Sequence, residues 1–287
     1  MLARNFWARL LGRRGLSGPQ NVWRTRPFEL RDLAGVPDNY RVGPPDFVGI
    51  GAVRSGTTWW YQLLIEHPSV RPNRLAQKEL SFFFHFGSRP MDTAAVSAYR
   101  QAFAAPRGCI CGEWTPGYLC YPLAVGYLAE AAPAAKLLAI VRNPVDRLFS
   151  ALNHRSQLPN ASLGLKGTRA YLLDTFSVFQ VLVAHSLYAQ AFRHVLQRFD
   201  RSRLLVLQYE QCVREPAAQI ARTYRFLALD DSFVPPSLNR RLNAVRYRAE
   251  PDPRYRGLLV DYFRDDVRAL FDLFPELDRS LWSDFAQ

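Results

Sequence analysis

Residues 46–65, DFVGIGAVRSGTTWWYQLLI, constrain the fold more than any other stretch of the chain. The first part, 47–52, is short, apolar and rich in Val, Ile and Gly, which is typical of a buried parallel strand. A turn of small residues follows, and from Thr57 the apolar side chains recur at helical spacing until Pro68. This order places free backbone N–H groups and the positive end of the helix dipole at one point. The stretch therefore predicts a loop that binds phosphate.

The rest of the chain alternates between strand patterns and helix patterns. This alternation predicts an α/β fold, in which a P-loop-like parallel sheet is flanked by helices on both faces. Residues 1–43 are polar, basic and punctuated by proline, so we expect an N-terminal basic extension and then a single domain over 44–287. The further strand candidates are 109–112, 137–141 and 203–207, and the helix candidates are 91–105, 122–131, 143–154, 178–199, 216–227 and 253–274.

The chain carries a strongly positive charge. Its formal net charge of +12 favours anionic partners such as a nucleotide, an acidic acceptor or a membrane surface. Nearly all the basic residues are arginines in an alanine-rich chain. This usage indicates a GC-rich genome more than a nucleic-acid surface, so we expect no nucleic-acid partner.

The sequence has no pattern typical of a metal site or a membrane span. Its four cysteines form no C-x-x-C pair and have no histidine at zinc-finger spacing, so we expect free thiols in a reducing cytoplasm and no bound metal. No apolar run reaches the length of a membrane span. Residues 1–14 mix apolar side chains with arginines, which predicts either a segment that touches a membrane peripherally or a locally docked helix.

The predicted phosphate loop departs from a nucleotide triphosphatase loop at one position. Gly51 begins a G-x-x-x-x-G pattern, but the triphosphatase motif then needs Lys where this chain has Thr57. The cation of the loop lies earlier, at Arg54, so its charge faces a different end of a ligand. The alternative is a tight turn without a ligand. The residues that would hold the phosphate are Arg54, Ser55, Gly56, Thr57 and Thr58.

A second candidate site combines Arg142 with Ser150. Arg142 ends a predicted strand, and Asn143 and Pro144 are suited to begin the next helix. Ligands of open α/β sheets bind at the carboxyl ends of strands, and arginine binds phosphate with two parallel hydrogen bonds. The alternative is that Arg142 pairs with Asp146 while Ser150 lies on a solvated helix face.

Two further clusters include residues able to act on an acceptor. Lys78 and Glu79 precede three phenylalanines, which suggests that this charged pair enters a partly buried cleft instead of lying on the surface. Residues 113–118, EWTPGY, form a predicted turn. Its aromatic residues could stack on a sugar or a lipid headgroup, or could simply pack.

The loop at 54–59, RSGTTW, resembles the 5′-phosphosulfate loop of sulfotransferases, which use 3′-phosphoadenosine-5′-phosphosulfate (PAPS). That family usually has Lys where this chain has Arg54. Arg142 and Ser150 match the positions of the family's 3′-phosphate motif. The resemblance further implies that Trp59 stacks on adenine. Arg246 and Arg248 lie where the family has a basic loop that closes over the 3′-phosphate.

The pattern K-E-x-x-F-F resembles the heparan sulfate branch of the sulfotransferases. The resemblance implies that Glu79 is the general base and that Lys78 faces the sulfonate. The cytosolic branch uses a histidine base and a downstream Arg-Lys-Gly motif, which this chain lacks, so His85 and then His154 are weaker candidates for the base.

The heparan branch usually reads Glu-Lys-Ser/Thr-Pro where this chain has 113–116, EWTP. The resemblance implies that Glu113, Trp114 and Tyr118 contact the acceptor. Trp114 replaces the lysine of the motif, which argues against recognition of a sulfated sugar.

These patterns and the resemblance together imply a cytoplasmic, bacterial, PAPS-dependent sulfotransferase that needs no metal. Its acceptor would be a hydroxyl or an amine of a small molecule, a glycan or a lipid. One alternative is a small-molecule kinase using ATP, against which the missing Lys at position 57 speaks. The other is a non-catalytic nucleotide or membrane-surface module, which would leave Lys78 and Glu79 unexplained. Residues 157–175, which we expect to choose the acceptor, have no readable pattern.

Overall fold

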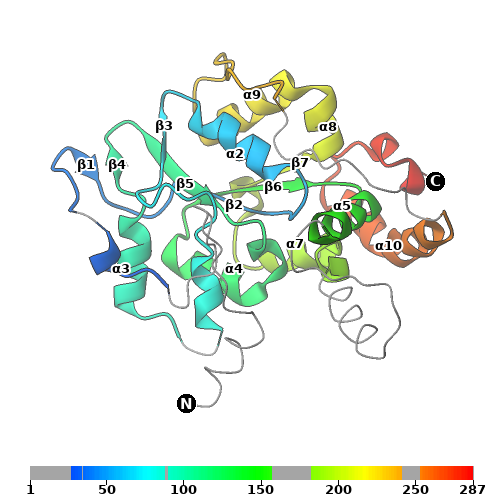
Figure 1. The fold of residues 1–287 in the computed structure, drawn as a ribbon, viewed down its shortest axis with the longest axis horizontal. Helices are drawn as coiled ribbons and strands as arrows, with labels where there is room; N and C mark the ends of the chain where they lie inside the picture. The colour runs from blue at the N-terminus through cyan, green and yellow to red at the C-terminus, as the bar shows by residue number, and fades with distance from the viewer. Residues whose placement is uncertain (1–26, 34, 88–89, 157–181, 241–252, 287) are drawn as a thin grey trace.

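The computed structural model describes residues 27–33, 35–87, 90–156, 182–240 and 253–286. The fold is built on a five-stranded sheet in the order β3-β5-β2-β6-β7, and every neighbouring pair is parallel (Figure 1). The predicted α/β fold with a parallel sheet is therefore confirmed. The strands are β2 Phe47–Gly51, β3 Val70–Pro72, β5 Ile110–Trp114, β6 Lys136–Val141 and β7 Leu204–Gln208.

The order of the strands places β2 at the point where the chain reverses direction across the sheet. From β2 the chain runs to the edge strand β3 and returns to β5, and it then crosses to β6 and β7 on the other side. Open α/β sheets bind their ligands outside the strand ends at such a reversal point. The loop after β2 lies at this place.

Helices cover both faces of the sheet (Figure 1). Side chains of β2 alternate between the two cores: Phe47 packs with α2 and α9, and Val48 packs on the opposite face. On the first face lie α2 Thr57–Ile65, α8 Tyr209–Arg214 and α9 Pro216–Leu227; on the second lie α3 Thr93–Gln101, α4 Pro122–Ala131, α5 Pro144–Ser156, α7 Tyr188–Leu196 and α10 Pro253–Leu273.

Part of the predicted N-terminal extension contacts the domain. β1 Tyr40–Arg41 pairs antiparallel with β4 Ala105–Pro106, and Phe28 packs against Phe82 with a ring separation of 4.7 Å. Residues 1–26 lie outside the described part of the chain. The remaining short elements are 3₁₀ helices: η1 Leu30–Asp32, η2 Phe82–Phe86, η3 Tyr118–Cys120, η4 Arg201–Arg203, η5 Arg279–Leu281 and η6 Ser283–Phe285.

The single long helix predicted over 178–199 is wrong for the residues that the structure describes. Residues 182–184 are helical, a turn follows, and α7 begins only at Tyr188. The turn contains Ser186, whose hydroxyl donates to the carbonyl of Pro144 at 3.1 Å and accepts from Nε of Arg147 at 2.7 Å. Hydrogen bonds to α5 thus interrupt a segment whose own periodicity is helical.

Candidate functional site

The loop after β2 has the backbone shape that its sequence predicts. Arg54 and Gly56 both have positive φ angles, 66° and 80°. Gly56 precedes α2, and a Cβ atom built there would lie 2.8 Å from the ring of Tyr209, so the position requires glycine. Gly56 is the N-cap residue of α2, and no side chain accepts a hydrogen bond there from the first N–H groups of the helix. The loop therefore combines a glycine cradle with an uncapped helix N-terminus.

The structure brings the Lys78–Glu79 pair against this loop. Nζ of Lys78 donates to Oγ1 of Thr57 at 3.1 Å and to Oε1 of Glu79 at 2.8 Å. The side chain of Lys78 is 15% exposed and that of Glu79 is 35% exposed, so the pair lies at the edge of the protein interior. Burial lowers the pKa of Lys78, and the negative charges of Glu79 and Glu113 oppose this change. A base candidate and an ammonium group thus lie at the first turn of α2.

The structure also brings Arg142 to the loop. Arg142 follows β6, the neighbour of β2, and its Nη1 lies 3.4 Å from the carbonyl oxygen of Arg54. Its guanidinium group lies 4.9 Å from the ring centre of Tyr209. The side chain of Ser150 on α5 is buried, so the alternative that it lies on a solvated face is wrong. The two arginines predicted to bind phosphate groups therefore lie at adjacent strand ends.

A hydrogen-bond network that the sequence did not reveal holds the turn after Arg142. Asn143 caps α5 as predicted, since its Oδ1 accepts from the N–H groups of Val145 at 3.0 Å and of Asp146 at 3.3 Å. Its own N–H donates to Oε1 of Glu210 at 2.9 Å, and its Nδ2 donates to Oδ2 of Asp284 at 2.9 Å. Burial raises the pKa of Glu210. No local sequence signal joins positions so far apart in the chain.

A second part of this network concerns the charge of Asp146. Its carboxylate pairs with Arg256 of α10 at 2.9 Å, and the guanidinium of Arg256 also binds Asp284. The carboxylate proposed as the alternative partner of Arg142 thus binds another arginine.

The cluster predicted to contact the acceptor is buried. Glu113, Trp114 and Tyr118 have no exposed surface. The ring of Trp114 lies against Gly49, and its Nε1 donates to the carbonyl of Gly51 at 3.2 Å. This burial argues against direct contact with an acceptor and corrects the expectation drawn from the sequence. The physical reason is that β5 extends through Trp114, where the sequence predicted a turn.

Trp59, the residue matched to adenine stacking, is only 3% exposed. Its Nε1 donates to the carbonyl of Leu238 at 3.2 Å, and its ring packs edge-on against Trp60. The indole ring of Trp59 is therefore not accessible for stacking on a ligand in this structure. Arg246, Arg248 and the 157–175 segment lie outside the described residues.

Several other features bear on alternative sites. His85 lies half-buried in η2, and His154 lies in α5. In the described part of the chain, no group of three His, Cys, Asp or Glu side chains could hold a metal ion. The four cysteines are free thiols, and no described helix is long and apolar enough to cross a membrane.

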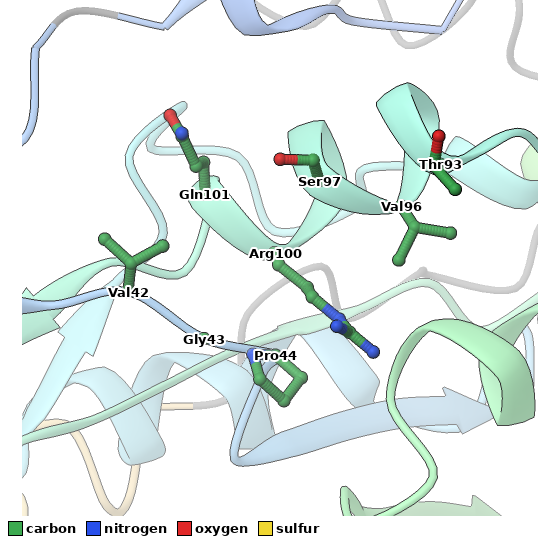
Figure 2. Close-up of a pocket in the computed structure, with 8 residues that line it drawn as sticks. All are labelled: Val42, Gly43, Pro44, Thr93, Val96, Ser97, Arg100 and Gln101. Carbon is green, nitrogen blue, oxygen red and sulfur yellow. The ribbon is translucent and has the colours of Figure 1, made fainter.

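A shallow hollow of about 510 Å³ lies between α3 and residues 42–44 (Figure 2). The side chain of Arg100 extends across it, and its Nε donates to the carbonyl of Ala131 at 2.9 Å. The hollow contains none of the predicted site residues. The residues that line it are Val42, Gly43, Pro44, Thr93, Val96, Ser97, Arg100 and Gln101.

Comparisons with known proteins find similarity to sulfotransferases. A family model described as "Sulfotransferase family" matches residues 114–232. Human heparan sulfate glucosamine 3-O-sulfotransferase 3B1 is 30% identical over 194 residues, which cover 64% of this chain and 46% of the relative. The chain thus matches less than half the length of that relative.

Solved structures agree over more of the chain. A sulfotransferase from Alicyclobacillus acidocaldarius is 26% identical, with a TM-score of 0.67, over 84% of this chain and 100% of that chain. A sulfotransferase from Mycobacterium avium is 15% identical, with a TM-score of 0.55, over 82% of this chain and 77% of that chain. The second similarity concerns the fold alone.

Proposed function

The chain belongs to the sulfotransferase family, and from this premise we propose that it transfers a sulfonate group from PAPS to a hydroxyl or an amine of an acceptor. The observation that carries the proposal is the contact between Lys78 and Thr57. Together with the bond between Lys78 and Glu79, this contact supports Glu79 as a base beside a loop suited to an anion, as a transfer to a bound acceptor requires.

The residues around the loop fit the two anionic groups of PAPS. The glycine cradle at Gly56 and the uncapped N-terminus of α2 suit the 5′-phosphosulfate, because N–H groups can approach its oxygens closely. Arg54, Ser55, Thr57 and Thr58 would complete this part of the site. Arg142 and Ser150 would bind the 3′-phosphate, and Arg246 and Arg248 would close over it. Trp59 would stack on the adenine once the segment around Leu238 moves away from the indole ring.

The described side chains suggest how the protein would promote the reaction. PAPS supplies an activated sulfonate group. Transfers of this kind depend on positioning and on charge stabilisation more than on covalent chemistry by the protein. We propose that Glu79 accepts the proton of the acceptor, while Lys78 and Arg54 offset negative charge at the transferring group.

The acceptor is proposed only at the level of its chemistry. The curated relative is named for the glucosamine of heparan sulfate, so heparan sulfate oligosaccharides are the first acceptors to test. Our proposal for the wider setting is a single domain over 44–287 in a bacterial cytoplasm, with residues 1–14 able to contact a membrane peripherally. A small molecule or a lipid is the next acceptor class to test.

A thermal-shift experiment tests the donor site. Adenosine 3′,5′-bisphosphate should raise the melting temperature clearly, because a ligand specific for the native state adds about 2.7 kcal/mol of stability at a hundredfold excess over its dissociation constant. ATP with magnesium should have little effect. If ATP gave the larger shift, the kinase alternative would replace this proposal.

A substitution at Glu79 tests the base. Glu79→Gln keeps the shape of the side chain and removes its ability to accept a proton, so turnover of PAPS with heparan sulfate oligosaccharides should fall about a hundredfold or more. Binding of the bisphosphate should persist. The matched control is Glu130→Gln, on the exposed face of α4, which should behave as the wild type. Turnover within a few-fold of the wild type would exclude Glu79 as the base and make His85 the next candidate.

A further inference from the structure

Glu113 is a fully buried carboxylate with an unusual number of hydrogen-bond donors around it. Its Oε2 accepts from the N–H of Leu80 at 3.0 Å and from the hydroxyl of Thr115 at 2.6 Å. Its Oε1 accepts from the hydroxyls of Tyr99 at 2.8 Å and of Tyr118 at 3.4 Å. A buried carboxylate is costly unless such donors surround it. The donors come from three separate parts of the chain, and one of them is the backbone beside the proposed base.

The segment from Lys78 to Ser81 is held along the end of β5 by three contacts. The carbonyl of Lys78 accepts from the N–H of Trp114 at 2.7 Å. The N–H of Leu80 donates to Glu113, and the N–H of Ser81 donates to Oγ1 of Thr115 at 3.1 Å. These contacts lie on both sides of Glu79 and fix its backbone. The side chain of Glu79 remains 35% exposed, and its Oε1 accepts from Nζ of Lys78 at 2.8 Å.

We propose that Glu113 is a positioning residue, whose buried oxygen fixes the Lys78–Ser81 segment and so holds Glu79, through its backbone, beside the loop that Lys78 contacts. This inference rests on the proposed function. Glu113 has no exposed surface and does not touch the reacting groups; it acts through the N–H of Leu80. The role differs from the acceptor contact that the sequence suggested for this residue. The four donors around Glu113 offset the cost of burying its carboxyl group.

The geometry shows which property of Glu113 matters. The N–H of Leu80 can only donate, so the position must offer an oxygen at that point. The hydroxyls of Tyr99 and Tyr118 can donate or accept, so the other end of the side chain can be an oxygen or an NH₂ group. Glutamine satisfies both requirements, while methionine has a similar length and offers only a weakly accepting sulfur. The pair Glu113→Gln and Glu113→Met therefore separates loss of the oxygen from loss of the charge.

The experiment measures kcat and KM for PAPS, with heparan sulfate oligosaccharides as acceptor, and the affinity for adenosine 3′,5′-bisphosphate. In Glu113→Met we expect kcat to fall about ten- to a hundredfold, because small misplacements of a reacting group cost up to this much. KM for PAPS and bisphosphate affinity should stay within about threefold, since the phosphate loop is unchanged. Glu113→Gln should recover most of the lost turnover.

A double-mutant cycle asks whether Glu113 acts through the proposed base. If it does, adding Glu113→Met to Glu79→Gln should lower kcat by no more than about threefold, because the misplaced group is already inactive. The control is Asp266→Met on α10. It removes a carboxylate that accepts from the N–H groups of Ala189 and Gln190, and it should reduce stability while leaving kcat near the wild type.

A second variant keeps the inference testable if Glu113→Met does not fold. Thr115→Val preserves the shape of the side chain but removes the oxygen that binds the N–H of Ser81, so it should give the same pattern, a lower kcat with unchanged bisphosphate affinity.

The inference would be overturned if Thr115→Val and a folded Glu113→Met both kept the wild-type kcat. It would also be overturned if Glu113→Met lowered kcat by the same factor in the wild type and in Glu79→Gln. A wild-type protein that neither bound the bisphosphate nor transferred sulfonate would overturn the proposed function and, with it, this inference. Wild-type transfer together with unaffected variants would overturn the positioning role alone.

Discussion

Glu113 should make the stability of the fold depend on pH. Burial raises the pKa of this carboxyl from 4.5 to about 7 and outweighs the hydrogen bonds from Thr115, Leu80 and Tyr99, which act in the opposite direction. The folded state therefore binds the proton more tightly than the unfolded state does. The resulting contribution to stability is fully present below pH 4.5 and is lost as the pH rises through about 7.

The size of the effect follows from the two pKa values. They differ by about 2.5, and one pKa unit corresponds to about 1.4 kcal/mol, so the contribution changes by about 3 kcal/mol across this range. Glu113→Gln provides the reference because its amide does not titrate and resembles the protonated acid in shape. The free energy of unfolding in urea should be measured for both proteins at several pH values from 4.5 to 8.5.

The difference in this free energy, wild type minus Glu113→Gln, isolates the carboxyl because the other groups titrate in both proteins. It should fall by about 3 kcal/mol between pH 4.5 and 7.5 and then level off. A difference that stayed constant would show that the carboxyl keeps its ordinary pKa. A difference that rose with pH would show that the hydrogen bonds outweigh burial, and either result would refute the reasoning.

Three further substitutions test other parts of the structure. Arg142→Ala should weaken the binding of adenosine 3′,5′-bisphosphate by about 1.5–3 kcal/mol, measured by calorimetry, and should weaken the binding of adenosine 5′-phosphosulfate much less. Equal weakening of the binding of both ligands would exclude a contact between Arg142 and the 3′-phosphate. Arg54→Lys should keep sulfonate transfer, since an ammonium group can supply the same charge; a folded but inactive protein would contradict the role of this residue. Gly49→Ala should lower the free energy of unfolding by about 1–3 kcal/mol, because the added Cβ would lie 2.0 Å from the ring of Trp114. The control Gly126→Ala should not lower it, because its Cβ would meet no atom within 4 Å. Equal stability of the two variants would contradict this packing.

Features encoded by neighbouring residues could be predicted from the sequence. The strand, loop and helix around Gly56 follow from apolar spacing and from one glycine, and both are local. The cap at Asn143 and the helices that begin at Pro122 and Pro216 also follow from residues within one turn. These features required no knowledge of tertiary contacts.

Features that depend on distant contacts could not be predicted. The break before α7 depends on bonds from Ser186 to Arg147 and Pro144, about forty positions earlier. The short strand β3 has too few residues to show a period. Glu210 and Asp284 bind Asn143 in the turn after β6, although they lie about 70 and 140 positions later in the sequence. Local patterns predict elements, and these interactions form between elements.

The pairing of Gly49 with Trp114 shows why the sequence misled at one site residue. The two residues lie opposite each other in the parallel pair β2–β5, and the missing side chain of Gly49 makes room for the indole. The indole N–H then donates to the carbonyl of Gly51, which precedes the phosphate loop. A lysine at position 114 would have to leave its charge in this dry space or extend away from it, whereas tryptophan fills the space and satisfies a carbonyl. The side chain at position 114 is thus determined by a glycine on the neighbouring strand. The tryptophan that the sequence assigned to the acceptor instead supports the backbone that leads into the loop after β2.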